Sequence, residues 1–308
     1  MILYILVCLV LAVLIGGAYY AYRISFYSPM EGRDTIKPVT NPNYEPYRPE
    51  MRRIFQTLKD RPCEFVTITS YDGLTLSGRY YHCRDGAPLD IGFHGYRSSP
   101  LVDFSGGSEL SLQLGHNLLL IDQRAHGKSQ GRTICFGIKE RLDLQKWVEY
   151  AVERFGKDVK IMLYGVSMGG ATVLMASSLP LPQNVKGIVA DCPYSNAMDV
   201  ILETAKEMPI PQFLVKPFVT LGAKLFGGFD INEIDAAQAV KDTKVPILII
   251  HGDSDTLVPA GMSEVPAKTN PKMVSRFLIS GAEHGISYLV DTERYHQLVI
   301  DFCEKLLN

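Results

Sequence analysis

One serine of this sequence lies in a pattern that would present its hydroxyl group as a nucleophile. Ser167 lies in the run Gly165-Val166-Ser167-Met168-Gly169, a G-x-S-x-G pattern flanked by two apolar segments. The glycines let the chain turn sharply from a strand into a helix, which lifts the hydroxyl clear of the sheet. The N–H groups that open the helix then face whatever the serine attacks. The pattern predicts a nucleophilic serine, and an ordinary Gly-Ser turn is the alternative.

A serine nucleophile needs a general base, and His284 is the best placed of the seven histidines. It lies between Gly281 and Gly285, in a loop that follows the last predicted strand. From such a loop an imidazole can reach the serine without being packed away. His94 and His251 each end a predicted strand before a glycine, where the ring can hold a loop by hydrogen bonds. A turn histidine is the alternative for His284.

Asp255 is the predicted acid that orients His284. It lies in the run 251–259, directly after an apolar strand, and Val258-Pro259 turns the chain behind it. Asp253, earlier in the same loop, is predicted to satisfy local N–H groups as a turn residue. A metal site of His251, Asp253 and Asp255 is disfavoured, because three ligands within five residues do not easily converge on one ion. We expect no metal and no organic cofactor.

Two N–H groups are expected to hold the oxyanion of a tetrahedral intermediate. One is that of Met168, immediately after the nucleophile, and the second belongs to the loop after the strand ending at His94. In that loop the small Gly95 allows close approach and the Tyr96 N–H is best placed. The phenol of Tyr96 is also expected to line the pocket. The alternative is a simple turn at the end of a strand.

The elements around these residues follow the pattern of an α/β protein. The stretch 63–83 alternates apolar and polar residues around Tyr71-Asp72-Gly73, which predicts an antiparallel hairpin. Apolar strands then alternate with longer helical segments, which predicts a mostly parallel central sheet with helices on both faces. The strands are predicted at Asp90–His94, Asn117–Asp122, Lys160–Tyr164, Lys186–Asp191, Val245–His251 and Val274–Ile279, and the helices at Phe104–Leu114, Ile138–Arg154, Met168–Ser178, Ser263–Lys268 and Tyr288–Leu307.

Two segments depart from this alternation. Residues 23–62 are rich in proline and charge and are predicted to form a linker that wraps the domain, with a short helix near 51–58. Residues of about 192–244 carry two helical segments broken by prolines. We expect them to form a short helical cap whose apolar side shapes an acyl pocket, and ordinary packing helices are the alternative. The domain itself is predicted to span 63–308.

Residues 1–22 contain no charged side chain. About 20 apolar residues are enough to cross a bilayer as a helix, so this segment is predicted to be a transmembrane anchor. A cleaved signal peptide is the alternative, but no Lys or Arg precedes the apolar run, which is longer than the usual h-region. Arg23, Arg33 and Lys37 follow the span and favour a cytoplasmic domain.

Composition excludes some functions and leaves others open. The net charge is −2 and the sequence pI about 6.4, so no basic field for nucleic acid exists. The six cysteines show no C-x-x-C spacing, which argues against a zinc site or a disulfide framework. Cys63 and Cys83 are expected to lie nearly opposite one another on the hairpin. Two packed thiols are favoured there over a disulfide.

From Cys63 onward, these motifs and their order resemble the α/β-hydrolase superfamily. The resemblance rests on His94-Gly-Tyr, on Asp122-x-Arg124-x-x-Gly-x-Ser, on Gly-x-Ser167-Met-Gly-Gly, on His251-Gly-x-x-Asp-x-x-Val-Pro and on the late Gly-x-x-His284. Ala125 lies in the Asp122-x-Arg124 motif at a position where members of this superfamily commonly have glycine. Asp122 and Arg124 are expected to brace the loops around Ser167. Within the superfamily the chain resembles membrane-anchored bacterial hydrolases of the serine aminopeptidase-like or cinnamoyl-esterase-like branch.

This resemblance implies hydrolysis of an ester, or less often an amide, through an acyl-serine. The sequence therefore predicts a membrane-anchored carboxylesterase acting on a small-molecule ester with an apolar acyl group. A peptidase or acyltransferase could use the same residues, and Glu203 or Glu207 could then receive a substrate amine. A domain that binds a partner or lipid without catalysis is the second alternative.

Overall fold

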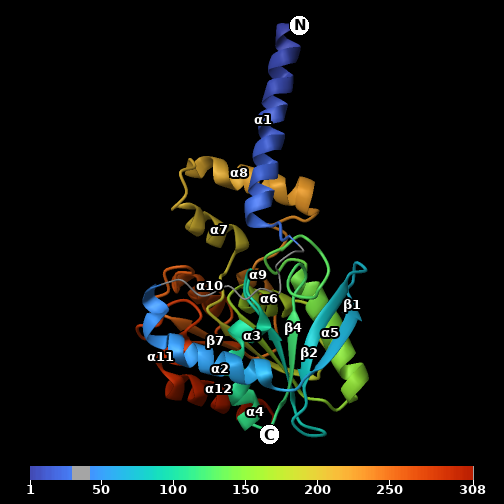
Figure 1. Cartoon of the computed structure of the whole chain (residues 1–308), viewed down its shortest axis with the longest axis vertical. Coiled ribbons are helices and arrows are strands. Elements are labelled where there is room, and N and C mark those ends of the chain that lie inside the picture. The colour runs from blue at the N-terminus through green and yellow to red at the C-terminus, as the bar shows by residue number, and fades with distance from the viewer. Residues whose placement is uncertain (30–41, 308) are drawn as a thin grey trace.

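The structure of the protein, a computed structural model, describes residues 1–29 and 42–307. Arg33 and Lys37, on which the prediction of orientation partly rests, lie outside these described residues. A globular part is built around one sheet, and a single helix, α1 (Ile2–Ser25), projects from it (Figure 1). The C-terminal end of the chain lies at the opposite end of the molecule from the tip of α1 (Figure 1).

The sheet has eight strands in the order β1-β2-β4-β3-β5-β6-β7-β8. The β1–β2 and β2–β4 pairs are antiparallel, and all other neighbours are parallel. This confirms the predicted α/β-hydrolase fold with its antiparallel start. The strands are β1 (Glu64–Thr69), β2 (Thr75–Tyr81), β3 (Leu89–Phe93), β4 (Asn117–Asp122), β5 (Ile161–Val166), β6 (Val185–Asp191), β7 (Ile247–Gly252) and β8 (Val274–Ile279).

Helices cover both faces of the sheet. One face carries α5 (Glu140–Phe155), α6 (Met168–Ala176), α9 (Ala236–Val240) and α10 (Gly261–Thr269), which pack against one another. The other carries α2 (Arg48–Asp60), α3 (Pro100–Asp103), α4 (Ser105–Gln113), α11 (Ser287–Val290) and α12 (Thr292–Leu307). Strands β3, β4 and β7 are buried along their whole length, as expected for parallel strands covered on both sides.

Some element boundaries differ from those predicted. The expected helix Tyr288–Leu307 is divided between α11 and α12 at Asp291, whose non-helical backbone (φ −138°, ψ 78°) ends the first and whose side chain accepts the Arg294 N–H. The short helix expected near 51–58 is longer: α2 starts at Arg48 with Pro49 in its first turn, and the short helix η1 (Pro42–Tyr47) precedes it.

The hairpin register contradicts the expected proximity of Cys63 to Cys83. Glu64 pairs with Tyr80, so Cys63 lies beside Tyr81, and Cys83 lies beyond the end of β2. All six cysteines are free thiols.

Between β6 and β7 the chain forms a layer above the sheet edge. Its helices are α7 (Ala197–Ala205), α8 (Gln212–Gly222) and η2 (Ala223–Gly227), and α9 then returns to the core. Asn196 caps α7 by accepting the Met198 N–H, and Pro209 and Pro211 separate α7 from α8. In Figure 1, α7 and α8 lie between the globular part and the projecting length of α1.

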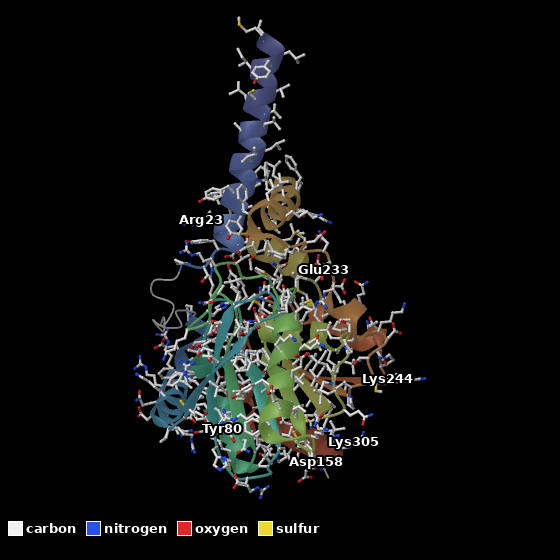
Figure 2. The ribbon with its side chains drawn as sticks, turned by 90° about the vertical axis from the view of Figure 1, so that its right-hand side faces the viewer. Arg23, Tyr80, Asp158, Glu233, Lys244 and Lys305 are labelled. Carbon is white, nitrogen blue, oxygen red and sulfur yellow. The ribbon has the colours of Figure 1, made fainter. Side chains whose placement is uncertain are left out.

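Helix α1 is long and apolar enough to cross a membrane, by length and composition. Its apolar side chains from Ile2 to Ile15 are exposed, whereas Ala18 and Tyr22 are buried against the rest of the protein. Phe26, just past the helix, lies in the main core and contacts the rings of Phe136 and Phe229. Figure 2 shows Arg23 where α1 meets the globular part.

Candidate active site

Ser167 lies at the turn between β5 and α6 with φ 55° and ψ −115°, a conformation that L-residues rarely adopt. Two glycines make this turn feasible. A Cβ atom on Gly165 would lie 2.1 Å from the Gly169 carbonyl oxygen, and one on Gly169 would lie 1.7 Å from that of Phe93. Because these neighbours are backbone atoms that cannot yield, only glycine fits at either position. The Ser167 N–H donates to the Asp191 carbonyl at 2.8 Å, which fixes the turn on β6.

The structure brings Ser167, His284 and Asp255 into one hydrogen-bonded chain. His284 Nε2 lies 2.8 Å from Ser167 Oγ, and its Nδ1 lies 2.7 Å from Asp255 Oδ2. An ionised carboxylate can only accept, so Nδ1 carries the proton and Nε2 is left to accept from the serine hydroxyl. The arrangement is that of a nucleophile, a base and an orienting acid.

Asp255 is held as an anion. Burial works to raise its pKa, but hydrogen bonds from His251 and His284 outweigh burial and lower the pKa to about 2. Its other oxygen accepts the N–H groups of Leu257 at 3.0 Å and Val258 at 2.7 Å. His251 Nε2 also lies 2.9 Å from the Val258 carbonyl oxygen, so this ring fixes the loop.

Asp253 lies apart from this chain of contacts. It is exposed and accepts the Gly281 N–H at 2.7 Å and the Ser254 hydroxyl at 3.0 Å. These hydrogen bonds lower its pKa. Asp253 therefore ties two loops together at the surface, as a turn residue would.

A contact that the sequence did not indicate joins the loops of Asp255 and His284. Glu283 is buried and accepts the Thr256 N–H at 3.1 Å, together with the Thr256 hydroxyl. The short helix η1 adds two hydrogen bonds to the loop of His284. Asn43 donates to Glu283 at 2.8 Å, and the Tyr44 hydroxyl donates to the His284 carbonyl at 2.7 Å. No local pattern predicts a contact between residues 240 positions apart.

Hydrogen bonds from two backbone N–H groups fix the loop after β3. The Gly95 N–H donates to Asp103 at 2.6 Å and the Arg97 N–H to His126 Nε2 at 3.0 Å. Gly95 also lies directly against Ser167, because a Cβ atom there would be 3.3 Å from that of the serine. Within the described residues, the Tyr96 N–H between these two has no acceptor.

Met168 supplies a second N–H group near the serine. It is the first residue of α6, so its N–H has no partner inside the helix. The partial positive charge at this helix end favours a developing negative charge. Together with the Tyr96 N–H, this group could receive an oxyanion next to Ser167 Oγ.

His94 stabilises this loop from beneath. Burial lowers the pKa of His94 to about 4, which keeps the ring neutral, and its Nε2 accepts the Gln123 N–H at 3.2 Å.

Ion pairs hold the loop that follows β4. Arg124 bridges Asp143 at 2.6 Å and Asp72 at 3.0 Å, and Asp122 pairs with Arg79 at 3.0 Å. The loop after β4 is thus braced by ion pairs in which Asp122, Arg124 and Asp143 are buried.

Ser167 opens into a cavity of about 530 Å³, within the range of small-molecule sites. Its walls are mostly apolar, and within the described residues the one charged side chain among them is Arg97. Helices α7 and α8 form part of the wall. The lining residues that flank the serine and its partners are Tyr96, Phe136, Tyr194, Leu257 and Val258.

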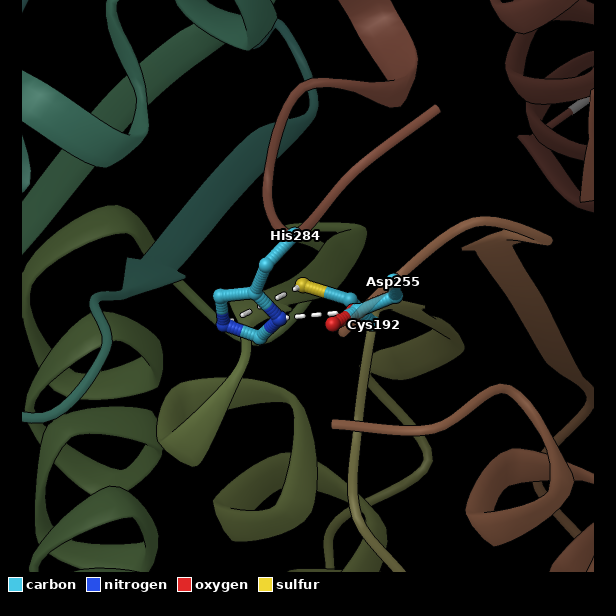
Figure 3. A group of neighbouring side chains, drawn as sticks. All are labelled: Cys192, Asp255 and His284. Atoms are coloured by element: carbon cyan, nitrogen blue, oxygen red, sulfur yellow. Dashed lines mark hydrogen bonds and ion pairs between the residues drawn. The ribbon is translucent and has the colours of Figure 1, made fainter. Parts of the chain in front are cut away.

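Cys192, Asp255 and His284 form a cluster in which one ligand atom from each lies within 4.8 Å of the others (Figure 3). Its chemistry does not suit a metal ion. Burial raises the pKa of the Cys192 thiol well above its usual value, whereas metals bind the thiolate. Both nitrogens of His284 are already engaged, and Cys192 Sγ lies 3.9 Å from Nε2.

The strand order and the helices on both faces of the sheet define the α/β-hydrolase fold. The family described as "alpha/beta hydrolase fold" matches residues 92–214. The Pyrococcus furiosus esterase Pf2001 superimposes with a TM-score of 0.68 at 25% identity, covering 89% of this chain and 98% of that one. Est1E of Butyrivibrio proteoclasticus, solved with ferulic acid, shares the fold with a TM-score of 0.60 at 22% identity, covering 79% of this chain and 99% of that one.

Among sequence relatives, the uncharacterized protein YqkD of Bacillus subtilis is 25% identical over 97% of this chain and 95% of its own length. The narrower branch suggested by the sequence stays a prediction.

Proposed function

We propose that the protein is a membrane-anchored serine hydrolase that cleaves carboxylic esters through an acyl-serine intermediate. The observation that carries this proposal is the hydrogen-bonded chain from Asp255 through His284 to Ser167, which ends in an apolar cavity. The esterases among the solved relatives support the choice of reaction.

In the first half-reaction, Ser167 Oγ attacks the ester carbonyl carbon while its proton passes to His284 Nε2. The negative charge on the carbonyl oxygen is received by the N–H groups of Tyr96 and Met168. Asp255 stabilises the imidazolium without taking its proton. The tetrahedral intermediate collapses, the C–O bond breaks, and the leaving alcohol takes the proton from Nε2.

In the second half-reaction, water replaces the alcohol. His284 Nε2 removes a proton from the water as it attacks the acyl-serine carbonyl, and the same N–H groups receive the charge. Collapse of this intermediate returns the proton to Ser167 Oγ and releases the carboxylic acid. The resting state is restored, and no cofactor enters either step.

The cavity favours an uncharged apolar acyl group over an amine. A peptidase specific for a free amine needs a carboxylate near the scissile bond. Glu203 and Glu207 are absent from the described lining, and Glu203 pairs with Lys206 at 2.6 Å. Both observations support an esterase over an aminopeptidase.

Membrane anchoring by α1 is supported by its exposed apolar surface from Ile2 to Ile15. A signal sequence passes the same test of length and composition. The small residues Gly16-Gly17-Ala18 could serve as a cleavage site. Cleavage there would, however, remove Ala18, which is buried against the globular part. This packing favours a helix that stays attached.

The test is ester hydrolysis by the full chain and by two matched variants. Ser167→Ala should lower kcat for p-nitrophenyl butyrate on the order of 10⁶-fold, because it removes the attacking atom. Cys192→Ala removes the other potential nucleophile near His284 Nε2 and should keep most of the turnover. If Ser167→Ala retains comparable activity, or if Cys192→Ala loses it, the serine is not the nucleophile.

A further inference from the structure

Helix α1 contributes to the cavity that contains Ser167. Gly17, Tyr20, Ala21, Ile24 and Ser25, all from its last turns, lie in the cavity wall. Opposite them stand apolar residues of the cap helices α7 and α8. A helix that served only to tether the domain would have no reason to border the substrate cavity.

The end of α1 is also bonded to the loop that carries the proposed oxyanion donor. The Tyr96 hydroxyl donates to the Ser25 carbonyl at 2.9 Å. Arg97 donates to the Ile24 carbonyl at 2.7 Å and to the Tyr27 carbonyl at 3.2 Å. The carbonyl groups of Ile24 and Ser25 are among those that the end of a helix leaves without an internal partner. The last turn of α1 is therefore fixed to the catalytic loop.

The position of α1 against the cap is equally fixed. A Cβ atom on Gly222 of α8 would lie 2.5 Å from the Ala18 carbonyl oxygen, and one on Gly17 would lie 2.4 Å from the Phe218 ring. Small residues at such a crossing let two helices approach closely. Figure 1 shows α8 crossing α1 at this level.

The outer side of the cap continues the apolar surface of α1. Phe213, Leu225 and Phe226 of the α8–η2 region are exposed, Phe213 to 76%. Lys206 and Lys216 stand beside Phe213 around an open groove on α8. Aromatic rings interleaved with lysines suit the boundary between lipid tails and headgroups. The cavity thus lies between the apolar helix α1 and a cap whose outer side suits a bilayer surface.

We propose that α1 is a wall of the acyl-binding cavity and that the substrate is a bilayer-resident ester with a long aliphatic acyl chain. This inference rests on the proposed serine hydrolase function. The acyl chain would enter from the lipid phase beside the crossing of α1 and α8 and extend along Ala21 and Ile24 of α1 toward Ser167. A short, water-soluble acyl group would leave most of this apolar surface uncovered.

The test uses the full chain reconstituted in phosphatidylcholine vesicles, with p-nitrophenyl acetate and p-nitrophenyl laurate as substrates. Ala21→Phe fills the cavity from α1, and Ala12→Phe makes the same change on the exposed part of that helix. Ala21→Phe should lower the ratio of kcat/KM for laurate to kcat/KM for acetate by about tenfold or more, because a pocket discriminates by the groups it can accommodate. Ala12→Phe should change neither. Ala21→Leu, a smaller plug, should give an intermediate loss if the phenylalanine variant folds poorly.

The outcomes separate this inference from the proposed function. Wild-type preference for acetate over laurate, or an unchanged laurate-to-acetate ratio in both Ala21 variants, overturns the role of α1 while the serine hydrolase stands. If the wild type hydrolyses neither ester and a fluorophosphonate does not label Ser167, the proposed function fails and this inference fails with it. Rates are compared per site labelled by a short-chain fluorophosphonate, so a partly folded variant does not mimic a blocked cavity.

Discussion

At the scale of residues, Asp255 determines what His284 can do. Because two imidazoles and two backbone N–H groups surround its carboxylate, its pKa of about 2 keeps it ionised at any pH at which the protein would work. An ionised acceptor fixes the proton on His284 Nδ1 and leaves Nε2 free to take the serine proton. The proposed base is thus prepared before substrate arrives.

Replacing Asp255 tests this role directly. Asp255→Asn should lower kcat on the order of 10⁴-fold, since an amide can stabilise the wrong tautomer of His284. Asp253→Asn is the matched control, because this exposed carboxylate lies two residues away and contacts neither Ser167 nor His284. Its kcat should stay nearly unchanged. Equal losses in the two variants would show that the loop, and not the charge on Asp255, matters.

Much of this site could be predicted from local sequence. Ser167, Asp255 and His284 each follow a strand in a glycine- or turn-rich loop, and parallel strands deliver such loops to one sheet edge. Glu283, Asn43 and Tyr44 could not be predicted, because their contacts join segments whose proximity depends on the whole fold. The prediction that Cys63 lies opposite Cys83 was wrong for a related reason. The turn sets the register of a hairpin, and the observed register places Cys63 beside Tyr81, two positions before Cys83.

At the scale of elements, the contact between α1 and α8 connects the projecting helix to the cap. Both helices have a glycine at the crossing, Gly17 on α1 and Gly222 on α8. The apolar composition of α1 is that of a helix able to cross a membrane, but it does not indicate which other helix α1 packs against. The pattern therefore predicted where the helix lies along the chain, while its packing against the cap emerges only from the structure.

Gly222→Ala should destabilise the protein, because its Cβ would meet backbone atoms of Ala18 and Tyr22 that cannot move aside. Overpacking of this kind costs about 1–3 kcal/mol, and thermal unfolding followed by circular dichroism would detect the fall in Tm. Gly16→Ala is the matched control, since open space surrounds that position on α1. Its Tm should stay equal or rise. A Gly222 variant as stable as the control would mean that the two helices do not pack as described.

At the scale of the whole molecule, α1, the cap helices and the α/β core are joined by direct packing contacts. Phe26, just past α1, lies in the main core, and α8 packs across α1. Tyr96 and Arg97 donate hydrogen bonds to the last carbonyl groups of α1. The antiparallel start of the sheet was predictable, because apolar runs and turn residues define a hairpin locally. The shared cavity was not, since it is formed by segments from both ends of the chain and from the cap.

The central claim is that Ser167 is the nucleophile of a serine hydrolase. The most direct measurement is reaction of the full chain with a fluorophosphonate probe, followed by peptide mapping by mass spectrometry. We predict one modified site, Ser167 Oγ, and no labelling of Ser167→Ala. A folded protein that takes up no probe, or that carries the modification at another residue, would contradict the claim.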